Sequence, residues 1–298
     1  MTPAPEVPNP LWVWVSAMRP RTLPAAISPV IVGSAIAAHD HRFSPAAASL
    51  CVVFALLVQV GTNFANDYYD FVHGADTPSR IGPQRAVASG LVSPAAMRRA
   101  MAGVFAAAFL SGLGLIHWGG PWMLAVGLAS IACGVAYTGG PFPLAYHGLG
   151  DVFVFVFFGL VAVTVTYFVQ ALRVSAHALL AGASMGLLSA NILLVNNYRD
   201  METDAAAGKK TLVVRFGREF ARAQFAVSLA AALAIAVVFA ATGYGLGCLL
   251  PLLLLPVAMA HLKRLTPAGT PPQLVALLGD TAKLMAAYAV LFAVGILI

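Results

Sequence analysis

The stretch "AAASLCVVFALLVQVGTNFANDYYDFVHGAD", residues 46–76, joins a long apolar run to a cluster of acidic side chains. Residues 46–70 are enough to cross a membrane as a helix, which takes about 20 residues. Asp67, Asp70 and Asp76 fall in its last turns and directly after them. The stretch therefore predicts a transmembrane helix that ends in a group of carboxylates.

The composition of the whole chain indicates a membrane environment. Hydrophobic residues make up 60% of the 298 residues and charged residues only 9%, and the mean hydropathy is +0.86. Soluble globular domains carry about 25% charged residues, so this composition excludes a soluble globular protein. We expect an all-α integral membrane protein, since backbone groups in lipid must be satisfied within each helix. We expect it to form a single domain, 1–298, with residues 1–16 as a cytoplasmic tail.

Apolar stretches of spanning length recur along the chain and predict a bundle of about nine transmembrane helices. They cover residues 23–39, 46–70, 97–117, 121–138, 150–170, 176–197, 222–242, 244–262 and 278–297. The longest connections, at about 71–96 and 198–221, carry five of the eleven acids and seven of the seventeen Lys and Arg residues. Long loops are more often functional than merely connecting, so the chemistry is expected there.

Positively charged residues lie at alternate ends of these spans. On one side they gather at Arg19 and Arg21, within residues 80–99, within residues 199–222, and at Lys263 and Arg264. The loops on the other side hold only Arg42 and Arg173. The positive-inside rule therefore places the N-terminus and the long loops in the cytoplasm and the C-terminus outside the cell membrane. The net charge of +6 reflects this topology and does not point to nucleic acid.

An internal repeat links the two long loops: "NDYYD" at 66–70 is echoed by "NNYRD" at 196–200. Helical spacing places Gln59, Asn63, Asn66, Asp67 and Asp70 on one face, and Asn196, Asp200 and Asp204 on another. Polar faces in a bilayer point into the bundle or a water-filled cavity. Helix capping could explain one acid, but not two matched clusters. We therefore expect both motifs to face one cavity, with the Gly74 turn returning Asp76 to it.

Converging carboxylates repel one another unless a cation neutralises them. Mg²⁺ prefers oxygen ligands and completes its shell with substrate phosphates. Basic residues follow each cluster, in "RIGPQRAVASG" at 80–90 and in "GKKTL" at 208–212, and such residues hold diphosphates. The sequence thus predicts an isoprenoid diphosphate held with Mg²⁺ at the membrane face, with an apolar cavity behind it.

These motifs resemble those of the UbiA superfamily of intramembrane prenyltransferases, and within it the 1,4-dihydroxy-2-naphthoate polyprenyltransferases (MenA type). The resemblance is carried by "AMRPRTLPAAISPVIVGSA" (17–35), "TNFANDYYDFVHGADT" (62–77), "RIGPQRAVASG" (80–90), "YTGGPFPLAYHGLGD" (137–151), "FFGLVAVTVTYFVQ" (157–170) and "NNYRDMETDAAAGKKTLVVRFG" (196–217). Asp76 follows Asp70 by six residues, whereas 4-hydroxybenzoate-type members usually have a shorter spacing. The longer spacing is like the naphthoate branch.

The resemblance implies a central cavity that opens to lipid, where a polyprenyl group passes from polyprenyl diphosphate to 1,4-dihydroxy-2-naphthoate. Diphosphate and CO₂ are lost, and demethylmenaquinone, a precursor in menaquinone biosynthesis, is formed. The metal ligands it implies are Asp67, Asp70, Asp76, Asp200 and Asp204. The catalytic residues would be Asp67, Asp70, Asp200, Asp204 and Lys209. Substrate-binding roles fall to Asn63, Asn66, Arg80, Arg85, Lys210, Tyr137, Tyr146, Asp151 and Arg19.

Some of these residues have equally simple structural explanations. Arg19 could reach the diphosphate or anchor the first helix at anionic lipid headgroups. Tyr137 and Tyr146 could orient the acceptor or belong to an interfacial aromatic belt, and Asp151 could be a helix N-cap.

Two other functions compete with this assignment. One is a prenyltransferase of the same superfamily with another aromatic acceptor, such as 4-hydroxybenzoate or homogentisate. The other is a metal or ion transporter, because repeated polar motifs also occur in transporter halves. Transporter sites lie near the bilayer midplane, whereas these acids lie at the cytoplasmic ends of their helices, which favours an enzyme.

Overall fold

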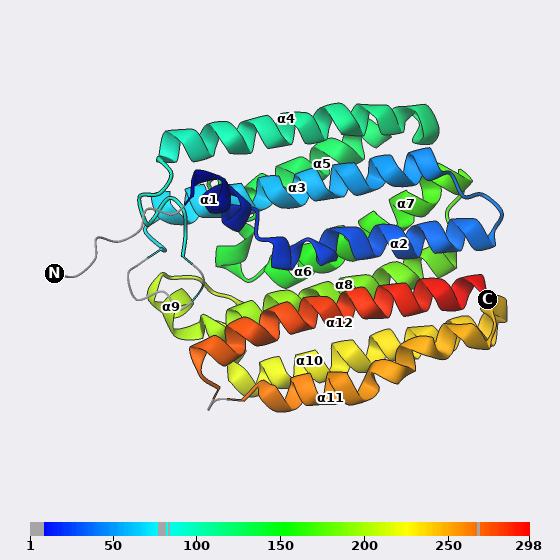
Figure 1. The fold of residues 1–298 in the computed structure, drawn as a ribbon. Coiled ribbons are helices and arrows are strands. Elements are labelled where there is room, and N and C mark those ends of the chain that lie inside the picture. Colours follow the sequence, from blue (N-terminus) through cyan, green and yellow to red (C-terminus); the bar gives the residue numbers. More distant parts are fainter. Residues whose placement is uncertain (1–8, 77–81, 83, 267–268) are drawn as a thin grey trace.

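The computed structural model describes residues 9–76, 82, 84–266 and 269–298, and Figure 1 shows them as a bundle of long helices running side by side. The α-helices are α1 (Pro10–Ala17), α2 (Pro24–His39), α3 (Pro45–Val72), α4 (Pro94–Gly119), α5 (Met123–Ala136), α6 (Gly150–Phe155), α7 (Ala162–Ala171), α8 (Ala176–Arg199), α9 (Met201–Ala206), α10 (Leu212–Phe239), α11 (Leu255–Arg264) and α12 (Pro271–Leu297). Segments of 3-10 helix are η1 (Pro20–Thr22), η2 (Leu144–His147) and η5 (Leu246–Leu254), and segments of π-helix are η3 (Val156–Val161) and η4 (Ala240–Tyr244). The described chain contains no strand, which confirms the all-α expectation.

Seven helices in the described ranges are long and apolar enough to cross a membrane. The bent pair formed by Pro10–Thr22 and Pro24–His39, with 49° between its parts, makes an eighth if it is counted as one span. α5 is apolar but has only 14 residues, so it falls short of the usual spanning length. A ninth span would require α5 to cross the membrane, although α5 is shorter than the usual spanning length.

The two long connections differ from one another. α3 ends at Val72 and α4 begins at Pro94, which confirms the expected first loop. The second loop is shorter than expected, because α9 and the start of α10 occupy most of residues 198–221. Gly217, with φ 81°, interrupts α10 near its beginning. Because of this break, the hydrophobic pattern predicted a helix only from residue 222.

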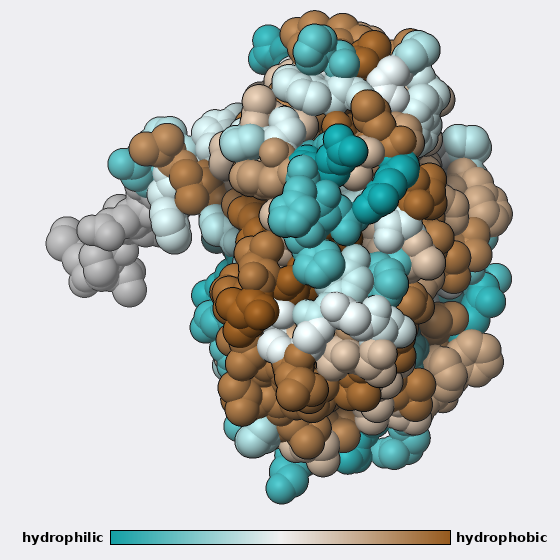
Figure 2. Space-filling view, turned by 90° about the vertical axis from the view of Figure 1, so that its right-hand side faces the viewer, coloured by the Kyte–Doolittle hydropathy of each residue, from teal (hydrophilic) through white to brown (hydrophobic). Residues whose placement is uncertain are grey.

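Large apolar side chains cover the flanks of the bundle. Leu110 on α4 is 66% exposed, Val227 on α10 is 68% exposed and Leu253 in η5 is 69% exposed. Figure 2, which looks at the end of the bundle opposite α9, shows hydrophilic side chains gathered in part of that end and brown apolar ones along the flanks. This distribution is the one that a bilayer requires of a multi-pass protein.

α8 is the most buried of the candidate spans, with 72% of its apolar window buried. It lies behind α12 in the middle of the bundle (Figure 1). Gly182 and Gly186, one turn apart, let α8 approach the π-helical segment η3 very closely. A Cβ atom at Gly186 would lie 2.5 Å from the backbone oxygen of Phe155, and one at Gly159 would lie 2.5 Å from the Cα of Gly186. Small residues at such positions are a usual way for membrane helices to pack.

We expect Gly186→Val to destabilise the protein by about 1–3 kcal/mol or more, because the added side chain must displace the facing backbone. Thermal unfolding in detergent measures the effect. Gly103→Val on α4 is the matched control, since a Cβ at Gly103 meets nothing within 4 Å. Equal melting temperatures for the two variants would refute this packing.

Candidate functional site

A cavity of about 310 Å³ brings the two acidic motifs together. Its polar wall includes Arg19, Gln59, Asn63, Asn66, Asp70, Asp76, Arg85, Asn196, Asp200, Asp204 and Lys209. Its apolar wall includes Val30, Cys51, Phe54, Leu115, Met123 and Val126. Along α3 the lining runs from Cys51 to Asp70, about 28 Å at 1.5 Å per residue. The site is therefore charged at one end and apolar over most of its length.

The first motif closes on itself as the Gly74 turn predicts. α3 ends at Val72, Gly74 has φ 70°, and the N–H of Ala75 donates to the carbonyl oxygen of Asp70 at 2.8 Å. Arg85 then joins the two acids, with Nη2 3.3 Å from Asp70 Oδ2 and Nε 3.5 Å from Asp76 Oδ1. The expected return of Asp76 to the cluster is confirmed.

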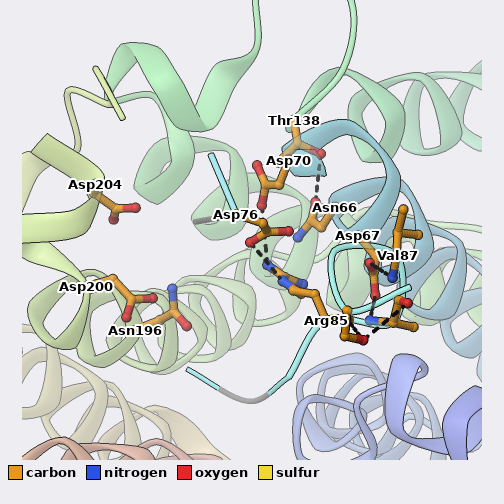
Figure 3. A network of polar contacts seen from close by, with 12 residues as sticks. Asn66, Asp67, Asp70, Asp76, Arg85, Val87, Thr138, Asn196, Asp200 and Asp204 are labelled. Carbon is orange, nitrogen blue, oxygen red and sulfur yellow. Dashed lines mark hydrogen bonds and ion pairs between the residues drawn. The ribbon is translucent and has the colours of Figure 1, made fainter. Parts of the chain in front are cut away.

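Asp67 lies at the edge of the polar stripe and does not line the cavity with Asn63, Asn66 and Asp70. Its carboxylate instead accepts hydrogen bonds from the backbone N–H groups of Ala86 and Val87, each at 3.1 Å. Figure 3 shows it turned away from the other acids. The structure thus does not bring Asp67 to the expected metal ligands, because the loop after Arg85 occupies both of its oxygens.

The second motif faces the first across the cavity, as Figure 3 shows for Asn196, Asp200 and Asp204. Asp200 forms a buried ion pair with its neighbour Arg199, whose Nε lies 2.7 Å from Asp200 Oδ1. Arg199 Nη2 also donates to Asn196 Oδ1 at 3.0 Å. Arg199 was not among the predicted site residues, although its place within "NNYRD" was a signal.

Lys209 connects the two motifs. Its Nζ lies 3.5 Å from Asp70 Oδ1 and 3.5 Å from Asp204 Oδ1. The hydroxyl of Tyr146 donates to Asp70 Oδ1 at 3.0 Å, and Lys209 Nζ lies 5.0 Å from the centre of the Tyr146 ring. Burial and the charge of Asp70 raise the pKa of Tyr146, so its hydroxyl stays protonated and remains a donor.

The break between α1 and α2 places Arg19 in the cavity wall, with its backbone in the left-handed region at φ 51°. Asn63 holds this break, because its amide donates to the carbonyl oxygen of Met18 at 2.8 Å and to Thr22 Oγ1 at 3.2 Å. Asn66 accepts from Thr138 Oγ1 at 2.9 Å. Both asparagines therefore line the cavity and fix its walls.

The other candidates are placed less centrally. Lys210 is exposed and meets the site only through its backbone N–H, which donates to the carbonyl oxygen of Tyr146. Arg80 lies outside the described residues. Tyr137 lines both the main cavity and a small side pocket that also contains Asp151. Asp151 accepts from Gln224 Nε2 at 3.0 Å, a partner on α10 that sequence periodicity could not reveal.

The donor set fits a hard divalent cation that is shared with a substrate. Asp70, Asp76, Asp200 and Asp204 line one cavity with the amide side chains of Asn66 and Asn196. Among the described residues no three His, Cys, Asp or Glu side chains form a ready-made metal group. Mg²⁺ commonly binds through a few carboxylates, waters and substrate phosphates, and this arrangement suits that mode.

Comparisons with known proteins agree with this geometry. A model of the UbiA prenyltransferase family matches residues 26–277. The chain is 38% identical over 278 residues to a 1,4-dihydroxy-2-naphthoate octaprenyltransferase of Mycobacterium leprae, covering 93% of each chain. It is 35% identical over 297 residues to one of Haemophilus influenzae, covering 97% of this chain and 96% of that one.

Solved structures share the fold. A UbiA homolog from Aeropyrum pernix matches with a TM-score of 0.70 at 18% identity, over 92% of this chain and 96% of that one. A UbiA homolog from Archaeoglobus fulgidus, bound to GPP and Mg²⁺, matches with a TM-score of 0.62 at 15% identity, over 95% and 100% of the two chains.

Asp204 offers a test of the charge balance at the site. Burial raises the pKa of Asp204 to about 6, and the negative charges of Asp200 and Asp70 act in the same direction. The positive charge of Lys209 opposes this rise. The folded state therefore disfavours the ionised carboxylate, at a cost that is full above pH 6 and absent below the unfolded pKa of about 4. In metal-free protein Asp204→Asn should raise the melting temperature by a few degrees at pH 7.5, and this gain should vanish near pH 4.

Glu202→Gln, on the same helix, is the control for this measurement. A hydrogen bond from Arg218 lowers the pKa of Glu202, so its replacement should bring no gain at pH 7.5. A wild-type protein at least as stable as Asp204→Asn at that pH would contradict the unfavourable charge at Asp204.

Proposed function

The chain belongs to the UbiA prenyltransferase family, and on this premise we propose that it transfers a polyprenyl group to 1,4-dihydroxy-2-naphthoate. Polyprenyl diphosphate is the donor, and the products are diphosphate, CO₂ and the reduced, dihydroxy form of demethylmenaquinone. The observation that carries the proposal is the single cavity whose charged end contains both acidic motifs, Arg85 and Lys209, and whose remaining walls are apolar. Such a cavity suits a substrate with a diphosphate head and a long hydrocarbon tail.

The charged end is assigned to the diphosphate. Bound Mg²⁺ would supply Lewis-acid stabilisation of the leaving group. Asp70 and Asp76 from one motif, and Asp200 and Asp204 from the other, are the residues proposed to hold it. Arg85 and Lys209, which are paired with these acids, would bind diphosphate oxygens and stabilise the negative charge that develops as the carbon–oxygen bond breaks.

The aromatic acceptor is assigned to the wall around Tyr137, next to the charged end. The ring carbon that carries the carboxylate forms the new carbon–carbon bond with the allylic carbon. The bond to the carboxylate then breaks, CO₂ leaves, and its electron pair restores the aromatic ring. Asp151, Tyr146 and Arg19 surround this region and are proposed to orient the acceptor.

The finer membrane arrangement is also part of the proposal. The single domain is proposed to span the cell membrane nine times, with the bent α1–α2 pair as one span and the short α5 as another. Its N-terminus and active-site loops would be cytoplasmic and its C-terminus outside, as the distribution of Lys and Arg supports. The cavity would open sideways to lipid, from which the polyprenyl chain enters.

An acceptor panel tests the proposed reaction. Purified protein, Mg²⁺ and one polyprenyl diphosphate should give prenylated product with 1,4-dihydroxy-2-naphthoate and none with 4-hydroxybenzoate or homogentisate. Asp200→Ala should lower the rate at least 100-fold while the protein stays folded. Asp280→Ala, which removes a partly exposed acid paired with Arg264, should not lower it.

Product from 4-hydroxybenzoate but not from the naphthoate would refute the assigned acceptor, while prenyl transfer to an aromatic ring would remain the reaction. Solute flux in liposomes without release of diphosphate would instead support the transporter alternative.

The length of the apolar wall yields a prediction about the prenyl chain. Gly127 lines the cavity, and a Cβ there would lie 3.8 Å from the Phe54 ring. Gly127→Leu should therefore narrow the tunnel and lower the rate with an octaprenyl donor at least 10-fold, while the rate with a geranyl donor changes little. Gly103→Leu, on an exposed face of α4, should affect neither donor. Equal losses with both donors would contradict a tunnel at Gly127.

A further inference from the structure

Asp67 belongs to the first acidic motif and yet takes no part in the charged wall of the cavity. Its side chain is only 2% exposed. Both carboxylate oxygens are used, Oδ2 by the N–H of Ala86 and Oδ1 by the N–H of Val87. Two donors from consecutive residues on one buried carboxylate fix the local backbone firmly.

The segment that Asp67 holds is also anchored by apolar contacts. Ala86 and Val87 are 5% and 3% exposed and pack in one cluster with Phe64 of α3 and Met97 of α4. The polar and apolar anchors act on the same two residues. The backbone at 86–87 is therefore docked against α3.

Arg85 directly precedes this docked pair and points the other way. Its guanidinium contacts Asp70 and Asp76 and lines the cavity. In Figure 3, Asp67 and Val87 lie on one side of the Arg85 backbone and the two acids on the other. The direction of the Arg85 side chain thus follows from the anchoring of the next two residues.

We propose that Asp67 is a positioning residue that holds Arg85 in place for the diphosphate, and that it is not a metal ligand. The inference rests on the proposed function, since it takes Arg85 as a diphosphate-binding residue. It also replaces the ligand role that the motif suggests. To reach a metal, Asp67 would have to leave two buried N–H groups without an acceptor, which is costly.

Binding of Mn²⁺, a paramagnetic substitute for Mg²⁺, separates the two roles. Asp67→Asn should bind as many Mn²⁺ ions per protein as the wild type in the presence of inorganic diphosphate, with a midpoint within twofold. Its affinity for diphosphate, measured calorimetrically at saturating Mn²⁺, should fall about 10-fold. Asp70→Asn should lose bound Mn²⁺. The inference is overturned if Asp67→Asn loses Mn²⁺ as Asp70→Asn does.

A double-variant cycle tests whether Asp67 acts through Arg85. Arg85→Gln alone should weaken diphosphate binding, and adding Asp67→Asn to it should weaken binding no further. If the two losses multiply, Asp67 acts independently of Arg85 and the inference fails.

A measurement on the wild-type protein does not depend on whether any variant folds. The backbone amides of Ala86 and Val87 should stay protected from hydrogen exchange when Mn²⁺ and diphosphate are added. Faster exchange there would show that Asp67 has released them and would overturn the inference. Failure of the wild-type protein to bind diphosphate at all would overturn the proposed function, and this inference with it.

Discussion

The structure depends on one constraint, which is that ionised groups inside a largely apolar bundle need partners. Each of the five motif aspartates has a defined one. Asp67 has two backbone N–H groups, Asp70 and Asp76 share Arg85, Asp200 has Arg199 and Asp204 has Lys209. These pairings dictate the course of the backbone around them. The loop after α3 turns back at Gly74 to bring Asp76 to Arg85, and the segment 85–87 lies where Asp67 can reach it.

The opposite end of the bundle follows the same rule. Tyr167 donates its hydroxyl proton to Asp40 at 2.6 Å, and Arg173 donates to both residues. Gln170, one turn from Tyr167, bonds to Ser34 on α2. This network ties α7 to α2. Paired charges thus stabilise both ends: the Asp40–Arg173 pair lies at the partly exposed surface, whereas the motif acids Asp70 and Asp204 line the cavity.

Much of this arrangement follows from local sequence patterns. The apolar runs predict the helices, the echo of "NDYYD" in "NNYRD" predicts two facing motifs, and Gly74 predicts the turn. The side-chain directions and long-range partners that the pattern did not predict depend on tertiary contacts. Helical spacing puts Asp67 at the edge of the polar stripe, and only the docking of Ala86 and Val87 decides which way it faces. Likewise, the partnership of Asp151 with Gln224 joins residues far apart in the chain.

Lys209 lies between Asp70 and Asp204, and this position affects how the negative charge of the acids is balanced. In the described chain the four cavity carboxylates are accompanied by four cations, Arg19, Arg85, Arg199 and Lys209. The protein therefore carries its own counterions at this site, one basic side chain for each acidic one. A cation that binds these acids must therefore displace Lys209, Arg85 or Arg199 from them, so its affinity reflects an exchange of partners and not capture by bare carboxylates.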